Sequence, residues 1–249
     1  VQRYLNAYTT ALRRQPFTLL YVDAFAGTPF HETSPLAEIV EPPFDRYLFF
    51  EKHRVRCAQL EQLRADFPAL ADRIVIERRE ANDAIRTLCA GGWAGRRATM
   101  FLDPYGMQVE WATIEAIAAT RAVDLWVLFP LGIAVNRLIT RSGEIPSPWR
   151  HRLDLMLGSE EWYQAFYEIV PEPTLFGDDR ARVVKASQEV IGGYFTRRLR
   201  GIFSGVADRP AILQNSRGMP LYLLCFAVGN PRGTETALRI ANHILREAT

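Results

Sequence analysis

The sequence predicts an α/β fold built on one mostly parallel sheet, because apolar strand-like runs alternate with segments of helical periodicity. Short continuous apolar runs are typical of strands that are buried on both faces of a parallel sheet. Five such runs follow one another at residues 18–23, 47–51, 73–77, 98–102 and 123–129. Helical patterns separate them, which favours right-handed crossovers between parallel neighbours.

The segments between these strands carry helix signals with recognisable ends. We expect helices at residues 1–14, 54–66, 82–91 and 110–120. In the first of them Leu5, Tyr8 and Leu12 recur at helical spacing. Pro68 lies just past the end of the second, and Asn82 is expected to cap the third.

The second half of the chain changes in pattern. Residues 131–178 hold helical pieces broken by prolines, and we interpret them as a helical insertion packed beside the sheet. The expected elements that follow are a helix at 179–200, strands at 211–215 and 221–228, and a helix at 234–247. The turn between those two strands is short, so they should run antiparallel. The whole chain, 1–249, is expected to form a single domain.

Composition limits the class of protein. Of the 249 residues, 48% are hydrophobic and 23% are charged, and the formal net charge is only +2, which is ordinary for a globular protein. No apolar run reaches the length of a membrane span. Cys57, Cys89 and Cys225 are far apart and fit reduced thiols in a cytoplasmic protein. The four histidines are scattered, so no metal site is expected.

Acidic residues follow four of the five parallel strands. Asp23 ends the first strand, four residues before Gly27, and Glu51 ends the second. Glu80 follows the third, and Asp103 follows the fourth. Because the carboxyl ends of parallel strands meet at one edge of a sheet, we expect these groups to line one cleft.

Each of these groups has a physical role if the ligand is a nucleoside. The carboxylate of Glu51 can accept hydrogen bonds from ribose hydroxyls, and Glu80 can accept one from an adenine amino group. The loop at Gly27 admits an amino-acid moiety whose ammonium Asp23 can meet. In Asp103-Pro104-Tyr105-Gly106, the carboxylate can orient an amine and the aromatic ring can stack on a flat substrate.

Five parallel strands finished by an antiparallel hairpin are the usual outline of class I S-adenosylmethionine-dependent methyltransferases, a Rossmann-like fold. The chain also resembles the three-Cys-motif partner (TcmP) family, bacterial and phage proteins with this fold. The resemblance covers most of the chain and rests on Tyr21–Gly27, Phe50-Glu51-Lys52, Glu80-Ala81-Asn82, Phe101–Gly106, 129–137, 222–226 and Asn230-Pro231-Arg232-Gly233.

This resemblance implies a cofactor, a reaction centre and a partner. The cofactor is S-adenosylmethionine, and the implied binding residues are Asp23, Phe25, Gly27, Glu51, Lys52, Glu80 and Asn82. The implied catalytic residues are Asp103, Pro104 and Tyr105, in a motif similar to that of enzymes that methylate amines of nucleic acid bases. The implied partner is a separate protein that carries three cysteines of the iron–sulfur type.

Two further observations bear on the function. The insertion contains several cations around Trp149, which makes contact with nucleic acid possible; they are Arg137, Arg141, Arg150, His151 and Arg152. Pro29 stands where a methyltransferase loop usually has glycine, and it removes a backbone donor.

Two alternatives to the methyltransferase therefore stay open. The first is a non-catalytic adapter that binds the cysteine-rich partner, and absence of cofactor binding would favour it. The second is a nicotinamide-dependent oxidoreductase. The lack of a Gly-x-Gly-x-x-Gly motif and the terminal hairpin argue against the oxidoreductase.

Overall fold

A mostly parallel sheet forms the centre of the protein. The structure is a computed structural model that describes residues 1–27, 43–172 and 180–247. Within these residues the main sheet has eight strands in the order β3-β2-β1-β4-β5-β10-β8, with β9 also paired to β10. The strands are β1 (Thr18–Asp23), β2 (Arg46–Phe50), β3 (Ile74–Glu77), β4 (Arg96–Leu102), β5 (Val123–Phe129), β8 (Gly205–Val206), β9 (Ala211–Gln214) and β10 (Pro220–Val228).

The direction of the strands agrees with the sequence prediction. Strands β1 to β5 pair in parallel, whereas β10 runs antiparallel to β5, β8 and β9. The predicted α/β class, a Rossmann-like parallel sheet finished by antiparallel strands, is therefore confirmed.

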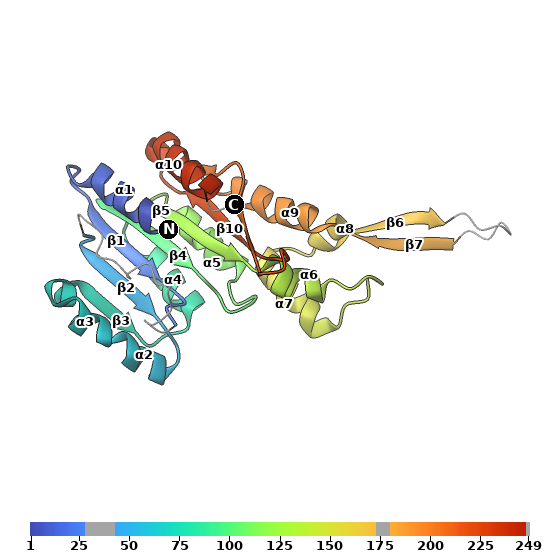
Figure 1. The fold of residues 1–249 in the computed structure, drawn as a ribbon, viewed down its shortest axis with the longest axis horizontal. Helices are drawn as coiled ribbons and strands as arrows, with labels where there is room; N and C mark the ends of the chain where they lie inside the picture. The colour runs from blue at the N-terminus through green and yellow to red at the C-terminus, as the bar shows by residue number, and fades with distance from the viewer. Residues whose placement is uncertain (28–42, 173–179, 248–249) are drawn as a thin grey trace.

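Helices cover both faces of this sheet (Figure 1). They are α1 (Gln2–Leu12), α2 (Arg54–Leu60), α3 (Gln62–Asp66), α4 (Ala81–Cys89), α5 (Trp111–Ala119), α6 (Asn136–Leu138), α7 (Ser147–Leu157), α8 (Trp162–Phe166), α9 (Gln188–Arg200) and α10 (Thr234–Glu247). Short 3-10 turns lie at η1 (Pro68–Arg73) and η3 (Pro231–Gly233), and a π-helical turn lies at η2 (Leu131–Val135).

Alternate residues of the buried strands pack into two separate hydrophobic cores, because successive side chains of a strand point to opposite faces of the sheet. Leu20 and Val22 of β1 pack into one core with α4, α5, α7, α8 and α9. Leu19 and Tyr21 of the same strand pack into the other with α1, α2, α3 and α10. The sheet is thus the middle layer of three.

The insertion contains more than the helices we predicted. After α6, α7 and α8 the chain forms an antiparallel hairpin of β6 (Tyr167–Glu172) and β7 (Arg180–Lys185). The hairpin projects from the body beyond α8 (Figure 1). The long helix predicted at 179–200 accordingly begins only at Gln188, where Ser187 caps it by accepting from the backbone of Val190. β-branched Val183 and Val184 favour a strand over that stretch.

The helix after β3 also begins differently from the prediction. Asn82 does not cap it; Glu80 is the cap, and its side chain accepts a hydrogen bond from the backbone of Asp83. A carboxylate at this position accepts hydrogen bonds from free backbone N–H groups, and the positive end of the helix dipole stabilises its charge.

Among the residues that the structure describes, no helix is long and apolar enough to cross a membrane.

Candidate functional site

Three acids meet at the carboxyl edge of the sheet. Asp23 is the last residue of β1, and its neighbours in register are Phe49 of β2 and Phe101 of β4. Glu51 and Asp103 each lie two residues beyond those neighbours, so both flank Asp23 on the same face of the sheet. The charges of Asp103 and Glu51 both raise the pKa of Asp23, which agrees with their proximity.

Asp23 is buried and has a raised pKa. Its side chain is 7% exposed, and burial is the main cause that raises its pKa to about 7; the Asp103 charge adds to this shift. A backbone hydrogen bond from Phe25 opposes the shift. The Oδ1 atom of Asp23 is buried and has no hydrogen-bond partner among the described residues. A buried carboxylate oxygen without a donor is costly, so this position suits a cationic donor from a ligand.

Glu51 is held in place by its own chain. It is 6% exposed, and its Oε1 accepts from the backbone of His53 at 2.8 Å. Its Oε2 lies 3.7 Å from the guanidinium of Arg56, and its backbone carbonyl accepts from the thiol of Cys57 at 3.1 Å. Each carboxylate oxygen can accept a second hydrogen bond, so Glu51 keeps capacity for a diol. Lys52 is exposed beside it.

The loop after β1 turns at a glycine. Gly27 has φ of +60°, a conformation that favours glycine because it has no Cβ. Phe25, half-buried, packs against the core on the α4 side of the sheet. Pro29, which departs from the methyltransferase pattern, lies outside the described residues.

Asn82 is buried and fully engaged with protein groups. Its amide donates to Glu80 Oε1 at 3.0 Å and to the Gln108 carbonyl at 2.9 Å. Its Oδ1 accepts from the Glu110 backbone at 3.0 Å and from Thr113 Oγ1 at 2.9 Å. Asn82 therefore ties α4 to the segment that follows Asp103. Its role as a cofactor ligand stays a prediction, and its side-chain amide already makes four hydrogen bonds within the protein.

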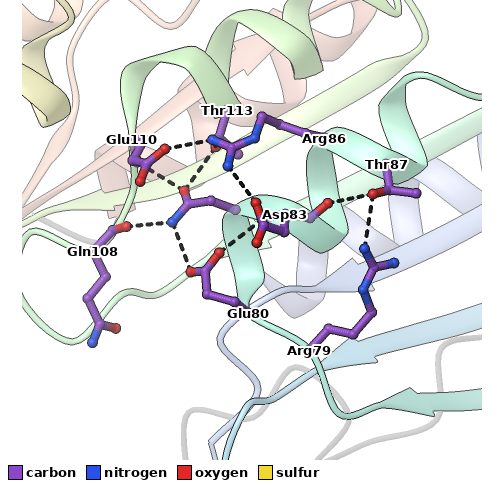
Figure 2. A network of polar contacts seen from close by, with 9 residues as sticks. Arg79, Glu80, Asp83, Arg86, Thr87, Gln108, Glu110 and Thr113 are labelled. Carbon is purple, nitrogen blue, oxygen red and sulfur yellow. Dashed lines mark hydrogen bonds and ion pairs between the residues drawn. The ribbon is translucent and has the colours of Figure 1, made fainter.

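Figure 2 shows the polar network to which Asn82 belongs, in which Arg86 forms ion pairs and Thr87 forms hydrogen bonds. Arg86 bridges Glu110 at 2.6 Å and Asp83 at 2.7 Å. Glu80 accepts from both Asn82 and the backbone of Asp83, so it is partly occupied although exposed. The same network that caps α4 therefore fixes the segment between Asp103 and α5.

The Asp103-Pro104-Tyr105-Gly106 turn presents an aromatic ring to solvent. Tyr105 is 90% exposed, while Pro104 is buried beneath it. Gly106 has φ of +74°, so the tight turn depends on glycine. An aromatic side chain with this exposure beside an acid is suited to stacking on a flat group.

Tyr222 is a site residue to which the sequence analysis gave no role. It lies near the start of β10 and is half-buried. Burial raises its pKa, and the charges of Asp103 and Tyr105 raise it further, which indicates that both lie near its phenol. No local sequence motif could indicate Tyr222, because it is far from Asp103 in the sequence. The antiparallel pairing of β10 with β5 brings it to the carboxyl edge of the sheet.

Potential metal ligands and cysteines do not cluster in the described part of the chain. No group of three or more potential metal ligands occurs there. Burial raises the pKa of Cys89 and of Cys225 to about 12, so both thiols stay protonated at neutral pH.

Comparison with known proteins finds relatives in structure alone. No protein-family model and no curated protein matches the chain. Protein LPL1258 from Legionella pneumophila is 12% identical with a TM-score of 0.50, over 99% of this chain and 90% of that one.

Two methyltransferases align less closely. Magnesium protoporphyrin IX methyltransferase from Synechocystis PCC 6803, solved with bound SAH, is 13% identical with a TM-score of 0.42, over 91% of this chain and 82% of that one. The C-terminal domain of precorrin-6Y C5,15-methyltransferase from Rhodobacter capsulatus is 13% identical with a TM-score of 0.33, over 72% and 84%. At these identities the comparisons describe the fold, which the Legionella protein shares with this chain.

Proposed function

We propose that this protein is an S-adenosylmethionine-dependent methyltransferase that acts on an amine of a nucleic acid base or a related substrate. The observation that carries the proposal is Asp23, a buried acid with an unpartnered oxygen between Glu51 and Asp103 at the carboxyl edge of the sheet. Ligands of open α/β sheets bind at this edge.

The side chains at this edge and their order along the sheet suit the parts of S-adenosylmethionine. Asp23 Oδ1 offers a buried acceptor for the ammonium of the methionine moiety, and Gly27 provides a turn without a Cβ. Glu51 offers the carboxylate for the ribose hydroxyls, with its orientation fixed by His53. When bound, S-adenosylmethionine supplies an activated methyl group on its sulfonium.

Asp103, Tyr105 and Tyr222 would handle the acceptor. The carboxylate of Asp103 accepts hydrogen bonds from the amine and so directs the nitrogen lone pair. Tyr105, exposed on its turn, stacks on the ring that bears the amine. Tyr222 lies near both, since their charges raise its pKa, and would limit how far the ring can move. Catalysis of this kind is mostly positioning.

A separate three-cysteine protein of the iron–sulfur type is part of the proposal on the ground of the family resemblance. The three cysteines of that type would belong to the partner, because Cys57, Cys89 and Cys225 of this chain are not grouped.

The test is transfer of labelled methyl. The protein is incubated with S-adenosylmethionine labelled in the methyl group and with RNA or single-stranded DNA, and the nucleosides are analysed by mass spectrometry. We expect label on an exocyclic amine. Label only in protein would contradict the nucleic acid acceptor. Absence of cofactor binding by folded protein would replace the enzyme with the non-catalytic adapter.

A further inference from the structure

A basic hollow lies at the base of the β6–β7 hairpin, outside the site described above. Its volume is about 660 Å³, and it is lined by Asn136, Arg141 and residues 182–188, which run from β7 to the first residue of α9. Three of its lining residues are cations: Arg141, Arg182 and Lys185. None of its lining residues in the described chain is acidic.

The cations in this hollow form no ion pair among the described residues, and Arg141 lies near enough to Lys185 to shift its pKa. The ammonium of Lys185 donates to the carbonyl of Asn136 at 2.6 Å, a neutral partner. Burial lowers the pKa of Lys185, and the charge of Arg141 lowers it further. Among the described residues no ion pair forms with Arg141, Arg182 or Lys185.

Arg150, another basic residue of the insertion, is engaged by the protein itself. Arg150 lies over the ring of Tyr163 at 4.8 Å and reaches Glu160 at 3.9 Å. Arg141 and Arg150 were both expected as cations around Trp149, but only Arg150 has a described acid as a partner. The hollow therefore holds three cations that form no ion pair with a described acid.

The hollow is connected to the carboxyl edge of the sheet. The turn η2 begins two residues after β5 ends, and Asn136 follows η2 directly. Gly132 of η2 lies so close to β10 that a Cβ on it would sit 1.9 Å from the Pro220 carbonyl. Tyr222, beside Asp103 and Tyr105, is two residues further along β10. One packed segment thus links the hollow to the proposed acceptor site.

We propose that this hollow binds a backbone phosphate of the nucleic acid strand whose base is presented to Asp103 and Tyr105, an inference that rests on the proposed function. Arginine and lysine, with the polar side chains of Asn136, Ser187 and Gln188, make the donor set that proteins use for phosphate oxygens. An exposed ring at the neighbouring edge adds the stacking surface that single strands require.

The experiment measures binding of fluorescein-labelled single-stranded RNA and DNA oligonucleotides by anisotropy, without cofactor. The test variant is Arg141→Gln with Arg182→Gln. The matched control is Arg13→Gln with Arg14→Gln, which removes the same charge from exposed residues just past α1. Leaving Lys185 intact preserves its hydrogen bond to Asn136 and protects folding.

We expect the test variant to weaken binding by about tenfold or more and to reduce the slope of log K against log salt by about 1 to 2, while the control changes neither. Preference for the RNA or the DNA oligonucleotide then identifies the strand. Equal losses in both variants, or no loss in the test variant, would overturn the inference. Competition by millimolar inorganic phosphate as strong as that by unlabelled strand would also overturn it, because the site would then be one for a free anion.

This readout is independent of catalysis. Strand binding that depends on Arg141 and Arg182, in a protein that binds no S-adenosylmethionine, would uphold the hollow and reject the methyltransferase. If the protein binds S-adenosylmethionine and the test variant binds the strand with normal affinity, the methyltransferase is upheld and the phosphate site in the hollow is rejected.

Discussion

Asp23 and Asp124 are two buried acids of one sheet that have the same raised pKa and opposite surroundings. They are 7% and 5% exposed, and burial raises the pKa of each to about 7. Asp124 lies beneath α1, where the Tyr4 hydroxyl donates to it at 2.7 Å and the Gly229 backbone and Arg97 favour its charge. Asp23 has instead two acids as neighbours and an oxygen without a described partner.

The difference teaches that a shifted pKa alone does not identify a site. Both acids are desolvated, but only Asp23 is left with an unmet acceptor at a strand end where ligands bind. Asp124 is a core residue whose hydrogen bonds are made within the protein. The predictions below treat Asp23 and its neighbours as the functional region and Asp124 as its structural counterpart.

The largest effect should come from Asp103→Ala. Loss of the group that orients the acceptor should reduce turnover by about 100-fold or more, because small errors of position cost factors of this size. Cofactor affinity should stay nearly unchanged, since Asp103 faces the acceptor. Labelled methyl transfer and calorimetry on the same preparation check this. Turnover close to that of the wild type would mean that the catalytic assignment is wrong.

Tyr4→Phe should separate stability from binding at the other acid. Removal of the hydroxyl leaves the buried Asp124 carboxyl short of a donor, so the free energy of unfolding should fall by about 1 to 3 kcal/mol. Urea denaturation measures this loss. Cofactor affinity should equal that of the wild type, and a changed affinity would erase the distinction between the two regions.

The two acids should also differ in their effect on pH dependence. Only ionised Asp23 attracts an ammonium, so cofactor affinity should rise by roughly fivefold or more between pH 6 and pH 7.5. Asp23→Asn should flatten this rise, whereas Asp124→Asn should keep it. Calorimetric titrations at four pH values test the difference, and a slope that survives in Asp23→Asn would assign the titration to another group.

The same shifts predict the sign of the stability change in the ligand-free protein. The pKa of each acid is higher folded than unfolded, so each contributes stability below about pH 4 that is lost as the pH rises to about 7. Thermal unfolding should therefore show a smaller loss over this range in Asp23→Asn or Asp124→Asn than in the wild type. A loss in both variants that equals the loss in the wild type would contradict the raised pKa values.

The strand ends were predictable from the sequence because burial in a parallel sheet leaves a continuous apolar run. β1 begins and ends at the residues that the pattern indicates, and Glu51 and Asp103 follow from the parallel order. The hairpin of the insertion was not predictable, since prolines in 131–178 masked the strand signal in Tyr167–Glu172.

Other features depended on partners that lie far apart in the chain. The hydrogen bonds of Asn82 come from Gln108, Glu110 and Thr113, and the charges that shift the pKa of Tyr222 come from Asp103 and Tyr105. Neither set has a local motif. The cap at Glu80 was missed because Asn is the more frequent capping residue.

Calorimetric titration of S-adenosylmethionine and S-adenosylhomocysteine tests the central claim most directly, in the wild type, in Glu51→Ala and in Tyr4→Phe. We predict micromolar binding to the wild type and to Tyr4→Phe, and a loss of about tenfold or more in Glu51→Ala, the cost of losing hydrogen bonds to a charged group. No binding of either ligand to well-folded wild-type protein, or equal binding in Glu51→Ala, would contradict the account.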